Sequence, residues 1–155
     1  MNKIILISIA TISLYCLSCK KKSQFKIEYL ELYNKPLNEI RNSLNGKWQV
    51  HKTQGGFSGF DISYPKNSFV EFKFGGNEAN DSIKSYNDTA IFVNNKVTWS
   101  KKYTNILISD STYLMKYTTI TVFPVETIVY KIKNDTLELR DNYPSGYSSY
   151  CTKVN

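Results

Sequence analysis

The chain has 155 residues, of which 41% are hydrophobic and 14% aromatic, and it carries a net charge of +7. Its hydrophobic content excludes an intrinsically disordered chain, and its length favours one domain with a substantial core. The basic residues that follow Lys22 are scattered and form no arginine cluster, so the charge suits an anionic membrane surface and argues against a nucleic-acid partner.

The amino terminus is an apolar segment between basic flanks. Ile4 to Ser18 is a run of 15 residues without a charge, preceded by Lys3 and followed, after Cys19, by a run of lysines. A membrane-spanning helix needs roughly 20 apolar residues, whereas this shorter length is typical of a secretory signal. We therefore expect a cleaved signal, and an uncleaved helical anchor is the alternative.

Ser18 followed by Cys19 resembles the end of a bacterial lipoprotein signal, in which a small residue precedes an acylated cysteine. The resemblance implies that residues 1–18 are removed, and that Cys19 carries diacylglycerol on its sulfur and a fatty acid such as palmitate on its amino group. We then expect a lipid-anchored protein in a bacterial cell envelope. Surface lipoproteins of Bacteroidetes tend to carry acidic residues after this cysteine, so Lys20-Lys21-Lys22 implies a periplasm-facing protein.

Residues 19–33 are predicted to form a lipidated tether, and residues 34–155 the folded domain. The stretch from Lys20 to Lys26 is polar and basic, which is typical of a solvated spacer. Basic residues beside an anionic membrane also strengthen binding, by about 1 kcal/mol each. The tether would therefore assist the lipid anchor.

A short helix is expected at the start of the domain. Asn34-Lys35-Pro36 is a typical helix start, with proline in the first turn, and Asn45-Gly46 is a suitable stop. Leu37, Ile40 and Leu44 fall on one helical face. We expect this amphipathic helix to cover one end or edge of the structure that follows.

From Gly46 onward apolar and polar residues alternate with a period of two, which is typical of β-strands. Turn-forming pairs such as Asn94-Asn95 and Asn134-Asp135 separate the alternating stretches. The predicted strands are Trp48–Thr53, Ser68–Phe74, Thr89–Val93, Lys96–Tyr103, Asn105–Ser109, Tyr113–Phe123, Glu126–Ile132, Thr136–Arg140 and Ser149–Val154, with Ser82–Tyr86 as a weaker candidate.

Short strands in close succession, without helices between them, indicate antiparallel hairpins. The chain is therefore predicted to be mainly β, an antiparallel barrel of about eight strands with a short N-terminal helix. Closing a sheet into a barrel removes the free edges that invite aggregation. A β-sandwich is the alternative.

Alternation also predicts which side chains face the core. The residues expected to point inward are Val70, Phe72, Phe74, Leu137, Leu139, Tyr150 and Val154. Their neighbours Cys151 and Lys153 are then expected to point outward. Along Tyr113–Phe123 the preference is divided between the two faces, and a bulge could switch them partway.

Gly46-Lys47-Trp48, at the start of the first strand after a short helix, resembles the starting motif of lipocalins. The stretch from Tyr130 to Leu139 is also similar to small lipocalin-like lipoproteins that are common in Bacteroidetes. The resemblance implies a lipocalin-like, cup-shaped β-barrel that binds small apolar molecules and whose floor is closed by Trp48. Lipocalins carry a late arginine over this tryptophan, but alternation places Arg140 on the outer face, so that role is not assigned to it.

Large apolar side chains of the strands, and of the glycine-rich loop Gly55–Gly59 expected at the mouth of the cup, are the candidate ligand contacts. The candidates are Trp48, Phe57, Phe60, Phe72, Phe74, Trp99, Tyr113, Met115 and Tyr117. Side chains of this size could instead fill a small barrel completely. The protein would then be an envelope interaction protein without a small-molecule ligand.

The sequence contains no pattern typical of catalysis. His51 is the only histidine and is expected to point outward, away from the orienting partners that a catalytic or metal-binding histidine needs. Cys151 has no disulfide partner if Cys16 leaves with the signal and Cys19 is acylated. No Cys/His set has zinc spacing. We therefore expect neither enzyme activity, nor a metal, nor a cofactor.

An Asp-Ser/Thr pair followed by a small or aliphatic residue occurs four times, at Asp81, Asp88, Asp110 and Asp135. This is similar to the acceptor pattern for O-glycosylation in Bacteroidetes. The alternative is turn chemistry, because Asp, Ser and Thr side chains bond to nearby backbone groups.

Overall fold

The computed structural model describes residues 29–104, 111–119 and 124–154. The predicted signal, the lipidated Cys19 and the predicted strand Asn105–Ser109 lie outside the described residues. The elements are β1 (Tyr29–Glu31), α2 (Leu37–Leu44), β2 (Gly46–Gly55), β3 (Phe60–Ser63), β4 (Phe69–Lys73), the 3-10 helix η1 (Glu78–Asn80), β5 (Ser82–Tyr86), β6 (Ile91–Lys96), β7 (Thr98–Tyr103), β8 (Ser111–Thr118), β9 (Pro124–Lys133), β10 (Thr136–Asp141) and β11 (Tyr147–Lys153).

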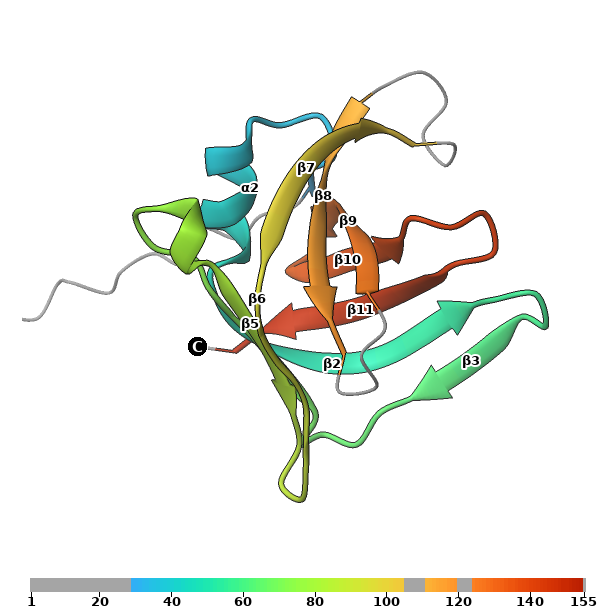
Figure 1. The fold of residues 1–155 in the computed structure, drawn as a ribbon. Helices are drawn as coiled ribbons and strands as arrows, with labels where there is room; N and C mark the ends of the chain where they lie inside the picture. The colour runs from blue at the N-terminus through green and yellow to red at the C-terminus, as the bar shows by residue number, and fades with distance from the viewer. Residues whose placement is uncertain (1–28, 105–110, 120–123, 155) are drawn as a thin grey trace, which may run out of the picture.

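The described strands form one curled antiparallel sheet (Figure 1). Its main path runs β6-β5-β4-β2-β11-β10-β9-β8-β7, while β1 pairs with β9 and β3 pairs with β2. The strands at the two ends of this path, β6 and β7, are consecutive in the chain and are separated only by Val97. The sheet therefore curls back on itself into a half-barrel, consistent with a lipocalin-like barrel.

The predicted fold class is confirmed, and the alternative of two separate sheets is wrong for the described strands. A hydrogen bond from the Asn95 side chain of β6 to the Thr118 carbonyl further links one end of the path to β8, the strand next to the other end. The weaker candidate Ser82–Tyr86 is a full strand, β5.

The predicted turn at Asn94-Asn95 is wrong, because both residues lie within β6. The chain turns earlier, where Asn87 Oδ1 accepts the backbone N–H groups of Thr89 and Ala90. A side chain that bonds to the backbone two and three residues ahead stabilises a turn. The strand then begins at Ile91, leaving the two later asparagines to pair with β5.

The domain begins before the predicted boundary at residue 34. β1 pairs with β9, with Leu30 opposite Ile132, and Leu32 is completely buried in the core. Residues 29–31 therefore belong to the sheet, and Leu32 and Tyr33 follow them in the folded domain, where their N–H groups donate to the Tyr130 carbonyl. This stretch is too short for its own pattern to indicate a strand, and it pairs with residues about 100 positions later in the chain.

The predicted helix is confirmed as α2, which packs against one end of the curled sheet (Figure 1). Its residues Ile40 and Leu44 are completely buried. The indole N–H of Trp48 donates to the carbonyl of Leu44 at 2.6 Å, which joins the end of the helix to the first long strand. Among the described residues, no helix has the length and apolar character needed to cross a bilayer.

A cation does lie over Trp48, but it is lysine. Lys153 Nζ is 5.3 Å from the centre of the Trp48 ring. Arg140 lies on the outer face, as predicted, with its guanidinium 3.5 Å from the centre of the Tyr130 ring. Arg140 also forms an ion pair with Glu138. Glu138 is buried, even though it lies on the outer face of β10.

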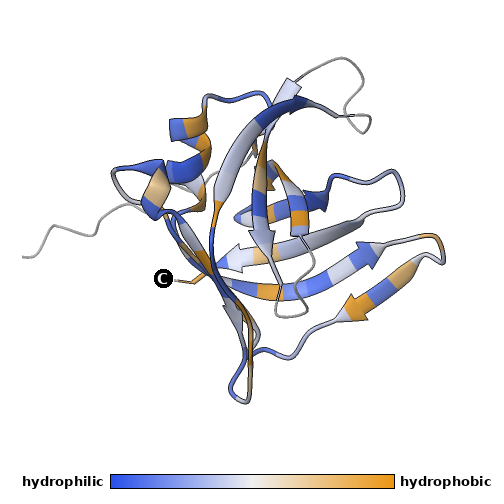
Figure 2. Cartoon of the chain, in the orientation of Figure 1, coloured by the Kyte–Doolittle hydropathy of each residue, from blue (hydrophilic) through white to orange (hydrophobic). Residues whose placement is uncertain are grey.

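Alternation predicts the inward face of β4 and β10 correctly, because Val70, Phe72, Phe74, Leu137 and Leu139 are all buried. Figure 2 shows the corresponding alternation of hydrophobic and hydrophilic positions along several strands.

The prediction for β11 is wrong. Cys151 is buried, whereas Tyr150 is half-buried and Val154 is exposed. The reason is the register with β2, in which Cys151 lies opposite Val50, and Tyr150 lies opposite Lys52 beside a register shift. Residues directly opposite one another lie on the same face of a sheet. Since Val50 points to the inner face, Cys151 does so too.

Candidate ligand-binding cavity

A cavity of about 190 Å³ lies within the curled sheet, and none of its described lining residues belongs to α2. Its lining comes from seven strands, so it exists only because the sheet curls. The lining residues are the aliphatic Val50, Val70, Ile83, Val93 and Leu139, the aromatic Tyr64, Phe69, Tyr86, Phe92 and Tyr117, and the small polar Thr53, Ser68, Ser85, Thr119, Ser149 and Cys151.

The described lining contains no charged side chain. Thr53 and Ser149 face each other across β2 and β11, with their hydroxyl oxygens 2.9 Å apart, so one of these hydroxyls donates to the other. Burial raises the pKa of the Cys151 thiol to about 12 and also raises the pKa of the Tyr117 hydroxyl, which keeps both groups neutral near neutral pH. The cavity therefore favours an uncharged ligand, because burying an unpaired charge is costly.

The volume limits what the cavity can enclose. A cavity of about 150 Å³ holds benzene, whereas pockets for drug-sized ligands span about 300–1,000 Å³. At about 190 Å³, this cavity suits a single ring or a short branched chain. A longer molecule would have to project through the opening.

The structure separates the predicted ligand contacts into distinct groups. Tyr117 lines the cavity. Trp48, Phe72, Phe74 and Met115 are buried in the core and do not line it. These four side chains therefore fill the core, and the cavity is lined by a different set of residues.

The remaining predicted contacts lie elsewhere. Trp99 is partly buried against Phe74, and Tyr113 is partly buried at the margin of the core. Phe57 is 99% exposed and Phe60 is 56% exposed on the β2–β3 hairpin, outside the cavity lining. Phe57 lies in the turn of this hairpin, and Phe60 pairs with Gly55 at the end of β2.

The lining residues of β5 and β6 were not among the predicted contacts. Ile83 and Ser85 alternate along β5, and a period of two would have placed them on one face had the register to β4 been known. Cys151 was missed because its face was predicted wrongly. Both omissions depend on pairing between strands, which short-range patterns do not contain.

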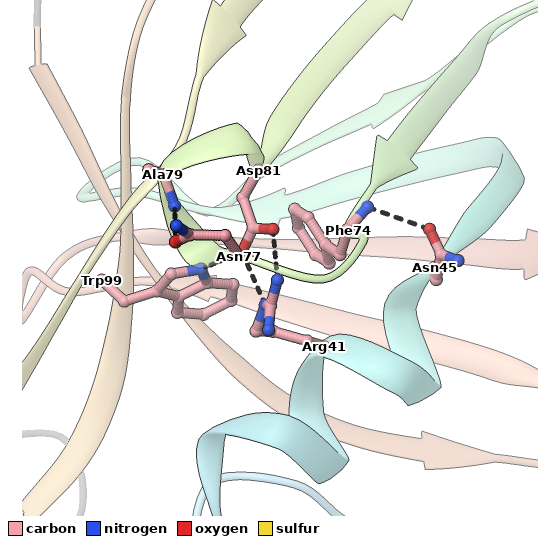
Figure 3. Close-up of polar contacts among 7 residues, drawn as sticks. All are labelled: Arg41, Asn45, Phe74, Asn77, Ala79, Asp81 and Trp99. Carbon is pink, nitrogen blue, oxygen red and sulfur yellow. Dashed lines mark hydrogen bonds and ion pairs between the residues drawn. The ribbon is translucent and has the colours of Figure 1, made fainter.

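A buried polar cluster lies apart from the cavity, where α2, η1 and β7 meet (Figure 3). Asp81 is fully buried and accepts two bonds from the Arg41 guanidinium, at 2.7 and 2.6 Å. The Trp99 indole N–H donates to the same carboxylate at 2.8 Å. The bond to Asp81 raises the pKa of Arg41. Since the carboxylate oxygens are occupied by protein donors, we interpret the cluster as a structural link between the elements.

This cluster accounts for one of the four Asp-Ser/Thr pairs, because Asp81 is held by Arg41 and Trp99. Asp135 has a left-handed backbone, with φ of 61°, in the tight connection between β9 and β10. Asp88 lies in the β5–β6 turn and binds the Asn67 side chain. Asp110 lies outside the described residues.

The candidates for catalysis are dispersed. His51 is exposed, and its Nε2 lies 2.6 Å from Thr152 Oγ1. Within residues 29–104, 111–119 and 124–154, no group of three or more His, Cys, Asp or Glu side chains is placed to hold a metal ion.

Cys151 should resist alkylation while the protein is folded. Only the thiolate reacts readily, and burial raises the pKa of this thiol to about 12 from an ordinary value of 9.0. We expect slow labelling by iodoacetamide at mildly alkaline pH and fast labelling after urea is added, measured by mass spectrometry. Equal rates in both conditions would contradict the buried position.

No protein family, curated protein or solved structure matches this chain.

Proposed function

We propose that the protein is a lipid-anchored binding protein of a bacterial cell envelope, whose curled sheet holds a small, uncharged, hydrophobic molecule. The observation that carries the proposal is the cavity of about 190 Å³ with no charged side chain in its described lining. The resemblance of Ser18-Cys19 to a lipoprotein signal supports the anchor. The function we propose is binding without catalysis, because the one thiol in the cavity is kept protonated by burial.

Filling the cavity should abolish binding. Ser149 lines the cavity, whereas its neighbour Ser148 lies opposite Arg140 on the other face of β11. We expect Ser149→Phe to lose the fluorescence increase that wild-type protein gives with N-phenyl-1-naphthylamine, a neutral apolar probe. Ser148→Phe should keep it. Overpacking costs about 1–3 kcal/mol, so a urea melt of each variant must show that it is folded at the assay condition.

The alternative is an envelope interaction protein without a small ligand, which is favoured by the filled core around Trp48, Phe72 and Phe74. Absence of probe binding by the folded wild-type protein would favour this alternative. Equal binding by wild type and Ser149→Phe would place the probe outside the cavity and would count against the ligand-binding proposal.

The anchor should depend on the thiol of Cys19. We expect Cys19→Ala to accumulate as an uncleaved precursor, because the lipid is attached through that sulfur, while wild type has an acylated amino terminus at Cys19. Mass spectrometry of the amino-terminal peptide measures both. An unmodified terminus at another residue of the wild-type protein would refute the anchor and leave the cavity proposal standing.

The lysines after Cys19 support a periplasm-facing orientation. Protease added to intact cells should then spare the protein and degrade it only after the outer membrane is permeabilised. Rapid degradation in intact cells would place it on the surface instead.

A further inference from the structure

Within the part of the chain that the structure describes, the strand β3 has a free edge. Among the described strands, β3 pairs with β2 alone, and the Tyr64 N–H donates to the His51 carbonyl at 2.8 Å. Backbone groups of successive residues in an antiparallel strand point alternately to its two sides. Tyr64, Ile62 and Phe60 therefore direct their N–H and C=O groups toward β2. Asp61 and Ser63 direct theirs to the open side.

This edge also carries large exposed apolar side chains. Phe60, Ile62 and Tyr64 are 56%, 46% and 40% exposed, and the hydropathy of β3 alternates in Figure 2. All three lie on the concave face of the sheet, because Ile62 is opposite the cavity-lining Thr53 and Tyr64 itself lines the cavity. An unpaired edge with exposed apolar residues and no lysine along the strand is a template for pairing with another strand.

We propose that β3 pairs with β3 of a second copy of this chain, antiparallel about a two-fold axis through Ile62. In this register Asp61 and Ser63 exchange backbone hydrogen bonds with Ser63 and Asp61 of the second copy. Their free groups are the ones that point outward, so the pairing uses them without disturbing β2. Ile62 meets its own copy, and Phe60 meets Tyr64, which covers the exposed apolar face.

The neighbouring registers are less favourable. Centring the axis on Asp61 places the two Asp61 carboxylates directly opposite each other, and like charges in that position repel. Centring it on Ser63 brings Pro65 into the pairing, and proline lacks the N–H that a ladder requires. The order aromatic, polar, aliphatic, polar, aromatic from Phe60 to Tyr64 is complementary to itself when reversed, as a two-fold interface requires.

The pairing would form a small, reversible interface, because a single short strand buries much less than the area typical of stable complexes. It would also place the two cavities close to the shared strand pair, since Tyr64 belongs to the cavity lining in each copy. The pairing itself does not depend on ligand binding or on the lipid anchor.

Disulfide trapping in membranes of cells that express the full chain tests the register. Residues across a non-hydrogen-bonded antiparallel pair have Cα atoms about 4.5 Å apart, which lies within the roughly 4.4–6.8 Å range of disulfides. Ile62→Cys should therefore form a covalent dimer under mild oxidation. Ser63→Cys is the matched control, because Ser63 is adjacent to Ile62 and exposed. In the proposed register Ser63 lies opposite Asp61 of the second copy, so the two Ser63 residues are only diagonal neighbours, on the face of the sheet away from Ile62. The unaltered chain measures any background from its own cysteines.

We expect a disulfide dimer with Ile62→Cys and only background with Ser63→Cys. Adding Ser63→Pro to the Ile62→Cys chain should remove the dimer, because it deletes an N–H that points to the second copy and not to β2. A urea melt with an unchanged midpoint establishes that this chain is folded. Background-level dimer with Ile62→Cys, equal dimer with Ser63→Cys, or dimer that persists with Ser63→Pro would each overturn the proposal.

Discussion

Replacing Trp48 with alanine is expected to lower the free energy of unfolding by about 3–5 kcal/mol, the usual cost of removing a large buried aromatic side chain. Trp48 is 1% exposed, and its indole N–H holds the last carbonyl of α2, that of Leu44, at 2.6 Å. The substitution removes the ring from the core and leaves that carbonyl without its donor. A small domain has only about 5–15 kcal/mol in total, so a urea melt should show a large shift.

Two further variants separate the contributions of Trp48. Trp48→Phe keeps a buried ring but cannot donate to Leu44, so its loss should be smaller than that of alanine. Gln49→Ala is the control on the opposite face of β2, where the Gln49 amide donates only to the exposed Lys66 carbonyl. It should cost less than about 0.5 kcal/mol, as surface changes usually do. A shift for Gln49→Ala equal to that for Trp48→Ala would contradict the facing of β2.

Replacing Asp81 with alanine is expected to cost a similar amount, about 3–5 kcal/mol, which is typical when one partner of a buried ion pair is removed. Asp81 is fully buried, and the carboxylate accepts from both Arg41 and Trp99. Its loss leaves a guanidinium with 13% exposed side-chain surface without its hydrogen-bonded counter-charge, and a partly buried indole N–H without an acceptor. A urea melt measures the loss.

The charge of Asp81 can be distinguished from its shape. Asp81→Asn retains the size and one oxygen acceptor but not the negative charge, so we expect a smaller loss than with alanine. Glu78→Ala removes an exposed carboxylate three residues earlier, at the start of η1, which acts on Arg41 through its charge alone, and it should change stability by less than about 0.5 kcal/mol. If Asp81→Asn were as stable as the original protein, the ion pair with Arg41 would contribute nothing.

The sequence alone was sufficient for the class of fold and for most of the elements. Strands such as β4 and β10 alternate strongly, and Phe72 and Leu137 point inward because a strand turns successive side chains to opposite faces whatever surrounds it. The helix α2 was predicted from its proline start and its apolar face, which are also local properties.

Pairing between distant strands decided what the local pattern could not. Alternation requires Tyr150 and Cys151 to face opposite sides, but it does not say which side is the inside. The position of Cys151 opposite Val50 made that choice. β1 was missed for a related reason, because Leu32 becomes a core residue only through contact with β9.

The candidate site was the least predictable part. Of the predicted ligand contacts, Tyr117 alone lines the cavity, because the size of an aromatic side chain does not show whether it fills the core or borders a void. Asp81 likewise looked like a turn residue, and its burial depends on Arg41, which lies 40 positions earlier. Hydropathy and alternation are set within each strand, so the sequence by itself determined the strands and their two faces. Only the tertiary structure decided which face of each strand is the inner one, where the cavity lies, and that the Asp81 carboxylate is buried, because all three depend on which strands and helices meet.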